Sequence, residues 1–129
     1  MNMADKHCVF CDEMAIGRAT ATLRTVFAIR DQYPVADRHS LIIPFRHTPD
    51  FFTMTTDERN DAFELVERLR QNLLNDDPSV LGFNLGMNCG QAAGQTVMHA
   101  HIHLIPRRAG DVIDPRGGVR GVIPERMKY

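Results

Sequence analysis

Residues 95–108 read Gln-Thr-Val-Met-His-Ala-His-Ile-His-Leu-Ile-Pro-Arg-Arg, with three histidines, His99, His101 and His103, at alternate positions. Side chains of a β-strand point to its two faces in turn, so a strand here would place the three imidazoles in one row. A helix would scatter them around its axis. Val97 and Ile105 share the histidine face. The opposite face is apolar and can pack on a core, and it consists of Met98, Ala100, Ile102 and Leu104.

Two kinds of chemistry suit such a row of imidazoles. Imidazole titrates near neutral pH and can act as a nucleophile. It is also the commonest metal ligand, and a metallohydrolase in which His99, His101 and His103 share one ion is therefore the alternative. Three incidental histidines are the least favoured interpretation, because the alternation is strict.

The segment His-Ala-His-Ile-His-Leu-Ile at 99–105 resembles the signature of the histidine triad (HIT) family of nucleotide hydrolases and transferases. Three further segments resemble bacterial members of that family: Gly-Phe-Asn-Leu-Gly-Met-Asn-Cys-Gly (82–90), Ala-Ala-Gly-Gln-Thr-Val (92–97) and Asp-Pro-Arg-Gly-Gly-Val-Arg-Gly-Val-Ile-Pro (114–124). The resemblance implies an α+β fold with an antiparallel sheet of about five strands, one main helix and one short helix. It also implies a homodimer.

For activity, the resemblance implies cleavage at the α-phosphate of a purine nucleotide conjugate through a nucleotidyl-histidine intermediate, with no catalytic cofactor. His101 would attack the phosphorus, His103 would donate to phosphoryl oxygens or the leaving group, and His99 completes the catalytic set. The substrate-binding residues that the resemblance implies are Asp31 at the ribose, Asn88, Gln95 and Thr96 at the phosphate, and His39 beside the triad.

The substrate stays open at this point. The Gln-Thr-Val and Pro-Arg-Arg flanks of the triad look closer to the diadenosine-polyphosphate branch of the family, and a nucleoside phosphoramidase of the same family is the first alternative. A nucleotide-binding module with slow hydrolysis is the second.

Cys8-Val-Phe-Cys11 is the other motif with a chemical meaning, because Cys-x-x-Cys is half of a structural zinc site or a redox pair. In the zinc-bearing branch of the HIT family, a cysteine pair is joined by one upstream histidine and by the first histidine of the triad. The resemblance thus implies a structural Zn²⁺ held by Cys8, Cys11, His47 and His99.

Composition limits the class of protein. The chain has 129 residues, which suits one domain over 1–129, and its 43% apolar and 24% charged residues are typical of a globular protein. The net charge of −1 gives no broad electrostatic footprint for nucleic acid. The absence of a signal peptide or membrane-spanning apolar run, and an odd count of three cysteines, predict a cytoplasmic protein without membrane partners.

Periodicity predicts short strands over 18–22, 25–30, 39–44 and 79–88 before the triad strand. A capping box at Thr55 and Glu58 predicts a helix that ends near Asn75. Its predicted buried stripe is Ala62, Phe63, Val66, Leu69 and Leu73. The core side of strand 79–88 is expected to carry Leu81, Phe83, Leu85 and Met87. Segment 110–129, rich in glycine, proline and arginine, is expected to lie as an extended arm over the sheet or a partner.

Overall fold

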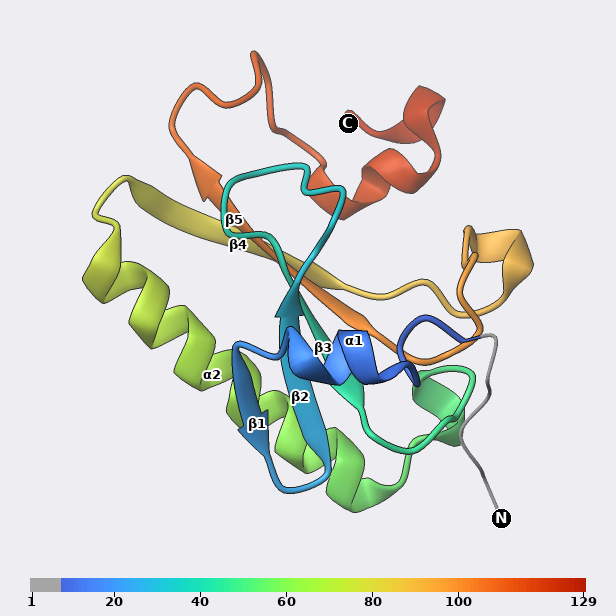
Figure 1. The fold of residues 1–129 in the computed structure, drawn as a ribbon. Coiled ribbons are helices and arrows are strands. Elements are labelled where there is room, and N and C mark those ends of the chain that lie inside the picture. Colours follow the sequence, from blue (N-terminus) through green and yellow to red (C-terminus); the bar gives the residue numbers. More distant parts are fainter. Residues whose placement is uncertain (1–7) are drawn as a thin grey trace.

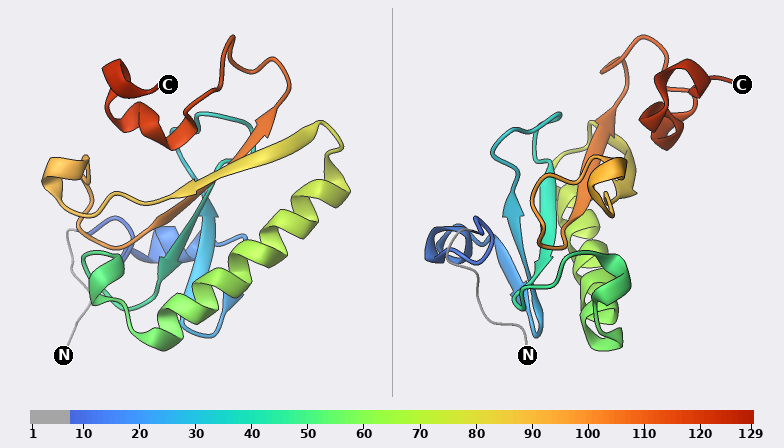
Figure 2. Two further views of the ribbon diagram at one scale, coloured as in Figure 1. Left: turned by 180° about the vertical axis from the view of Figure 1, so that it is seen from behind. Right: turned by 90° about the vertical axis from the view of Figure 1, so that its right-hand side faces the viewer.

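The computed structural model describes residues 8–129. A five-stranded antiparallel sheet runs in the order β1-β2-β3-β5-β4 (Figure 1). The strands are β1 (Ala21–Leu23), β2 (Val26–Arg30), β3 (Ser40–Pro44), β4 (Val80–Gly86) and β5 (Ile102–Arg108). One long helix, α2 (Thr56–Asp76), crosses one side of this sheet, and the short helix α1 (Glu13–Gly17) lies on the other side (Figure 2). The α+β prediction is confirmed.

Two apolar clusters lie on the two sides of the sheet. The larger one joins α2 to the sheet through residues such as Leu65, Ile42 and Ile102. The smaller one packs Phe27 and its neighbours against the segment that carries Cys8 and Phe10, and so fixes the N-terminal segment close to the triad. None of the helices within residues 8–129 is both long and apolar enough to cross a membrane.

Helix α2 begins where the sequence predicts. The Thr55 hydroxyl accepts from the Glu58 N–H at 3.1 Å, and the Glu58 carboxylate accepts from the Thr55 N–H at 2.8 Å. The expected stripe needs one correction: Phe63 is half exposed, whereas Leu65, which was not predicted, is buried. Asp61 binds the β1–β2 turn through Arg24 and Thr25, and this contact sets the rotation of the helix about its axis.

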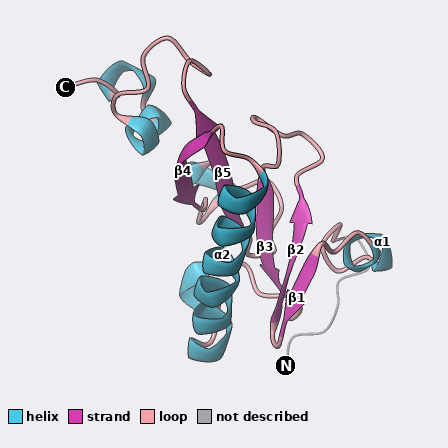
Figure 3. Cartoon of the chain, turned by 90° about the vertical axis from the view of Figure 1, so that its left-hand side faces the viewer, coloured by secondary structure: helices cyan, strands magenta, loops and turns pink. Residues whose placement is uncertain are grey.

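Strand β4 lies at the edge of the sheet, on the far side from β1 (Figure 3). Leu81 and Leu85 were expected in the core but are 73% and 48% exposed. The pairing with β5 shifts between Val80 and Gly82, and this bulge takes Leu81 out of register. Leu85 lines a hollow beside the C-terminal segment, while Phe83 packs on the larger cluster.

The triad segment is less regular than predicted. Only His103 lies in β5, because the chain bends at 97–99 and His99 and His101 precede the strand. The Ala100 N–H donates to the Thr48 carbonyl at 2.7 Å, which draws this segment toward the loop that bears His47. Ala100, Ile102 and Leu104 are buried as expected, whereas Met98 is 47% exposed.

The C-terminal segment is not an extended arm. After β5 it folds into two short 3₁₀ helices, Gly118–Val122 and Pro124–Arg126, and the first of them packs next to β4 (Figures 1 and 2). Three of its four cationic side chains have partners: Arg116 and Lys128 bind Asp114, and Arg120 donates to backbone carbonyls. The pairs cancel much of the segment's basic character.

Candidate active site and metal cluster

His99, the first histidine of the triad, is fully buried between β3 and the N-terminal segment. Its Nε2 lies 2.8 Å from the Pro44 carbonyl oxygen. A carbonyl can only accept, so Nε2 carries the proton and Nδ1 keeps its lone pair. Burial holds the pKa of His99 below its usual value, which favours this neutral form.

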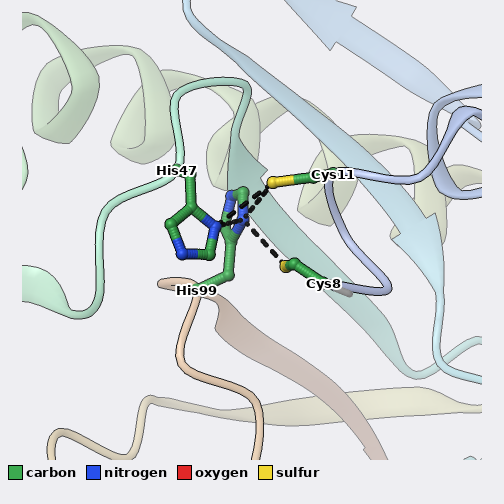
Figure 4. Close-up of side chains that lie close together, drawn as sticks. All are labelled: Cys8, Cys11, His47 and His99. Atoms are coloured by element: carbon green, nitrogen blue, oxygen red, sulfur yellow. Dashed lines mark hydrogen bonds between the residues drawn. The ribbon is translucent and has the colours of Figure 1, made fainter. Parts of the chain in front are cut away.

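The free Nδ1 of His99 points at Cys8, Cys11 and His47 (Figure 4). It lies 3.4 Å from each sulfur and 3.2 Å from His47 Nδ1, and Cys11 Sγ lies 3.2 Å from His47 Nδ1. Four ligands of tetrahedral zinc, with bonds of about 2.0 Å to nitrogen and 2.3 Å to sulfur, lie about 3.3–3.8 Å apart. The four residues brought together therefore match a possible zinc site in both chemistry and spacing.

The electrostatics of this cluster also suit a cation. Burial raises the pKa of the Cys8 thiol, and the neighbouring Cys11 sulfur raises it further. A buried thiolate is stable only with positive charge beside it. Zn²⁺ would supply that charge, and the acceptor nitrogens of His47 and His99 would complete the set.

His101 presents the opposite tautomer to His99. Its Nδ1 lies 2.8 Å from the His99 carbonyl oxygen, so Nδ1 carries the proton and Nε2 has the free lone pair. The Phe10 ring packs on the imidazole with its centroid 5.0 Å away. A buried imidazole whose Nδ1–H is fixed, and whose Nε2 has no hydrogen-bond partner within residues 8–129, has the orientation that a nucleophile needs.

The proton on His103 is set by a chain of two hydrogen bonds. The Val35 N–H donates to His39 Nδ1 at 3.2 Å, so His39 carries its proton on Nε2. That Nε2–H donates to His103 Nδ1 at 2.9 Å, which leaves the proton of His103 on its own Nε2. Burial, with smaller contributions from His101 and His39, lowers the pKa of His103 to about 4. His103 is therefore a neutral donor at neutral pH.

The same two hydrogen bonds argue against a metal site at Asp31, His39 and His103. The ligand-capable atoms of Asp31, His39 and His103 lie together, with Asp31 Oδ2 3.4 Å from His39 Nε2. His39 would have to bind an ion through Nε2, yet Val35 occupies the lone pair of Nδ1, so Nε2 keeps its proton. The hypothesis of one ion shared by the three triad histidines is also wrong, because the free nitrogen of His99 faces the cysteines.

A hollow of about 430 Å³ is lined by His101, and it is here called the nucleotide pocket after the ligand that the sequence resemblance implies. Among the predicted substrate-binding residues it is lined by Asp31, Asn88 and Thr96, together with His103. Asp31 uses Oδ1 to accept from the Tyr33 N–H at 2.9 Å and keeps Oδ2 near His39. His39 itself is buried and borders the pocket only through its contact with His103.

Gln95 does not line the nucleotide pocket. Its side chain is buried and bonds to backbone on three sides: Oε1 accepts from Gly90, and Nε2 donates to the carbonyls of Pro49 and Val97. Both amide hydrogens are used, so none is left for a phosphate in this arrangement. Gln95 instead holds the loop that carries Thr96.

Several residues of the pocket were not predicted, and two of them are Phe10 and Arg18. Phe10 lines it from between the two cysteines, and Arg18 lines it from the end of α1. The place of Phe10 inside Cys-Val-Phe-Cys could have indicated its role, because the same residues that bind the metal fix its position. Arg18 gives no local signal, since only the packing of α1 on the sheet places it there.

This combination of a five-stranded antiparallel sheet and a histidine-lined pocket is the one that the histidine triad resemblance predicts. The HIT domain model matches residues 17–110, and the chain belongs to the HIT family of nucleotide hydrolases and transferases. No single relative fixes its substrate.

Three proteins similar to this chain illustrate the range of activities and metal content among its relatives. The chain is 32% identical over 108 residues to an adenosine 5′-monophosphoramidase from Candida albicans, covering 78% of this chain and 70% of that protein. It is 37% identical over 78 residues to an asymmetrical bis(5′-nucleosyl)-tetraphosphatase from Schizosaccharomyces pombe, covering 60% and 42%. A zinc-bound histidine triad family protein from Mycobacterium smegmatis superposes with a TM-score of 0.74 at 29% identity, covering 84% and 80%.

Proposed function

We propose that the protein cleaves purine nucleotide conjugates at the α-phosphate and transfers the nucleotidyl group through His101 to water or another acceptor. The observation that carries this proposal is the hydrogen bond of His101 Nδ1 to the His99 carbonyl, because it leaves Nε2 as the nitrogen that can attack in a residue that lines the nucleotide pocket. A purely structural role for His101 would not explain why a ring nitrogen stays available in a residue that lines a pocket.

In the first step, Nε2 of His101 forms a bond to the α-phosphorus, and the bond from phosphorus to the leaving group breaks with its electron pair. His103 donates from Nε2 to a phosphoryl oxygen or to the leaving atom, which its neutral tautomer permits. In the second step water attacks the phosphorus, the N–P bond breaks, and the released proton goes to solvent. Catalysis of this kind depends on positioning and on stabilising the spread negative charge.

Substrate contacts divide between two ends of the nucleotide pocket. Asp31 Oδ2 accepts from the ribose hydroxyls, and Asn88 and Thr96 donate to phosphate oxygens. Gln95 acts indirectly by holding the loop of Thr96, and His39 acts by fixing the tautomer of His103. Phe10 and Ile29 supply apolar surface for the base.

The cluster of Cys8, Cys11, His47 and His99 holds Zn²⁺ in this proposal. The ion stabilises the N-terminal segment and fixes His99, and it takes no part in the displacement at phosphorus. Its support is the spacing of the four donor atoms and the likeness to the zinc-bound Mycobacterium smegmatis protein.

The relatives leave two substrate classes open for this protein. Diadenosine polyphosphates and nucleoside phosphoramidates are both compatible with a displacement at the α-phosphate, and the names of the two relatives cover both kinds of reaction. A homodimer and a cytoplasmic location remain predictions.

The proposal is tested by the intact mass of the protein after brief exposure to diadenosine tetraphosphate and, separately, to adenosine 5′-phosphoramidate. We expect an adduct of the mass of AMP on the wild type and none on His101→Asn, with the substrate that gives more adduct identifying the branch. Cys89→Ser serves as a matched control because this thiol lies outside the metal cluster. Hydrolysis that a chelator abolishes, without any adduct, would contradict the covalent mechanism.

A further inference from the structure

Segment 44–49 runs from the end of β3 toward α2 and contacts segment 95–101, which carries His99 and His101. Four of its residues make the contact through a carbonyl oxygen or a ring nitrogen: Pro44 and His47 contact His99, Thr48 contacts Ala100, and Pro49 contacts Gln95. Figure 4 shows His47 turned toward His99. The position of segment 44–49 therefore bears on the geometry of the triad.

Thr48 is linked to the nucleophile through one peptide group. The Ala100 N–H, which donates to the Thr48 carbonyl at 2.7 Å, belongs to the same peptide group as the His99 carbonyl. That carbonyl accepts from the Nδ1–H of His101 at 2.8 Å. The N–H and C=O of a trans peptide lie in one plane and point in opposite directions, so a hydrogen bond on one side fixes the direction of the other. Thr48 thus orients the acceptor that decides which ring nitrogen of His101 carries the proton.

Arg46 ties segment 44–49 to the start of α2. Its Nε and Nη2 donate to the two oxygens of Glu58 at 2.9 and 2.8 Å, and Nη2 also donates to the Thr53 carbonyl at 2.9 Å. Thr53 in turn contacts Thr48, hydroxyl to hydroxyl. A guanidinium that binds both oxygens of a carboxylate is fixed in direction as well as in distance. Most of the segment lies beyond β3, so these bonds take the place of a strand ladder.

Glu58 is a fixed anchor for this pair. It lies in the first turn of α2, is 4% exposed, and also accepts from the Thr55 N–H in the capping box. Burial alone would raise the pKa of its carboxyl, but the hydrogen bonds from Arg46 and Thr55 outweigh burial and hold the pKa below its usual value. The carboxyl is therefore charged at neutral pH. A neutral glutamine serves equally well at this position of a capping box, so the cap by itself does not account for the arginine.

We propose that the Arg46–Glu58 ion pair positions His101 for attack, because it fixes segment 44–49 and so lets the Thr48 carbonyl orient the peptide group that holds the imidazole. Neither residue of the pair lines the nucleotide pocket, so both are positioning residues. Their effect on the reaction rate rests on the proposed function, whereas their effect on the imidazole does not. Without the pair, the bond to Nδ1 weakens, and the proton is then shared with Nε2, the nitrogen that attacks.

The test removes the ion pair without leaving a buried charge. Arg46→Met combined with Glu58→Gln does so, because the glutamine oxygen still accepts from the Thr55 N–H and keeps the cap. Arg24→Met is the matched control, since Arg24 also binds two carboxylates of α2 but does so from the β1–β2 turn. Urea unfolding measures how much stability each variant loses.

The first readout is the ¹⁵N NMR spectrum of the imidazoles, in which the signals of His101 are assigned by their absence from His101→Asn. We expect the wild type and Arg24→Met to show His101 with its proton on Nδ1 alone. The double variant should show both tautomers, and its Nδ1 proton should exchange with water about tenfold faster. Arg46→Lys keeps the charge but loses the two-point contact, so its spectrum should lie between the two.

The second readout is kcat and KM for the nucleotide that gives more AMP adduct. A misplaced nucleophile slows the chemical step and leaves nucleotide binding intact, so the double variant should lower kcat about tenfold or more, with KM changed less than about twofold. Arg24→Met should change neither constant.

The outcomes separate this inference from the proposed function. If the wild type forms no AMP adduct and hydrolyses neither nucleotide, the proposed function fails, and the NMR comparison still decides whether the ion pair orients His101. An unchanged His101 spectrum in the double variant overturns the inference whatever the activity. A changed tautomer with an unchanged kcat overturns its catalytic part. If the double variant does not fold, Arg46→Lys decides by the same spectrum.

Two further results would assign the effect to another cause and overturn the inference. The first is an equal change of tautomer in Arg24→Met, because lost stability would then be the cause. The second is a double variant that has lost its zinc, together with a chelator-treated wild type that shows the same His101 spectrum. The metal would then orient His101 in place of the ion pair.

Discussion

The triad histidines do not share one tautomer, and the neighbouring groups decide where each proton lies. The Pro44 carbonyl fixes the proton of His99 on Nε2, while the His99 carbonyl fixes that of His101 on Nδ1. His39 fixes that of His103 on Nε2. As a result one histidine is free to bind a metal, the next to attack, and the last to donate.

Replacing His39 tests whether it sets the proton of His103. In His39→Phe, Nδ1 of His103 loses its donor, so we expect both tautomers of His103 in its ¹⁵N NMR spectrum and a fall in kcat of about tenfold or more, with KM less affected. His39→Gln is the matched control, because its amide can still donate. A single, unchanged His103 tautomer in His39→Phe would show that His39 only fills space.

The lowered pKa of His103 predicts a loss of stability in acid. The folded value is about 4 and the ordinary value is 6.5, so the unfolded chain binds the proton first as the pH falls. Stability from this residue is complete above about pH 6.5 and declines toward pH 4, by up to about 3 kcal/mol at 1.36 kcal/mol per pKa unit.

This decline is measured by urea unfolding of the wild type and of His103→Asn between pH 4 and 7. The difference between the two proteins isolates His103, because the other titrating groups, the metal ligands included, are common to both. We expect the wild type to lose more free energy of unfolding than the variant. Parallel curves would mean that His103 is solvated and ordinary.

Among the elements, the segment from Cys8 to Cys11 serves both the metal cluster and the nucleotide pocket. Its cysteines face His47 and His99, and Phe10 between them packs on the ring of His101. Val9 and Phe10 line the nucleotide pocket. The candidate metal ligands and part of the lining of the nucleotide pocket thus lie in one short piece of chain.

This sharing predicts that zinc and nucleotide strengthen each other's binding. Removal of zinc by a chelator, or the substitution Cys11→Ser, should weaken AMP binding by about 5- to 150-fold, the range of a typical coupling free energy. Isothermal titration measures this, and by reciprocity bound AMP should tighten zinc binding by the same factor. Phe10→Ala should weaken AMP binding while the metal content stays at one zinc per chain. Equal AMP affinity with and without zinc would show that the segment does not couple the two sites.

At the scale of the whole molecule, the sheet ends in an open edge at β4. An uncovered edge strand with exposed apolar side chains is a common place for two chains to pair. Leu81 is 73% exposed on this strand. The edge is therefore where we expect the predicted homodimer to form.

Leu81→Lys tests that expectation, because a charge on the edge opposes pairing. Light scattering during gel filtration should give a dimer for the wild type and a monomer for the variant. Phe52→Lys is the control, since Phe52 is equally exposed but lies in a 3₁₀ turn remote in sequence from β4. A wild type that is monomeric at micromolar concentration contradicts the prediction.

Local patterns predicted most of the elements. The capping box at Thr55 and Glu58 located the start of α2, and the alternation around Ile102 and Leu104 located the buried face of β5. These succeeded because caps and strand faces depend on neighbours within a few residues. The rotation of α2, which exposes Phe63 and buries Leu65, depends on Asp61 meeting the distant β1–β2 turn, and no local pattern carries that information.

The sequence by itself determined the α+β class, the family signature and the residue types of the site, because these depend on the order and spacing of side chains along the chain. Only the tertiary structure decided where each proton lies, since the carbonyl of Pro44 and the N–H of Val35 come from segments remote from the triad. It also showed that the bend at 97–99 turns His99 toward the cysteines, and that Gln95 bonds to backbone. Long-range hydrogen bonds and metal sites need groups from distant parts of the chain to lie close in space, and only folding brings those groups together.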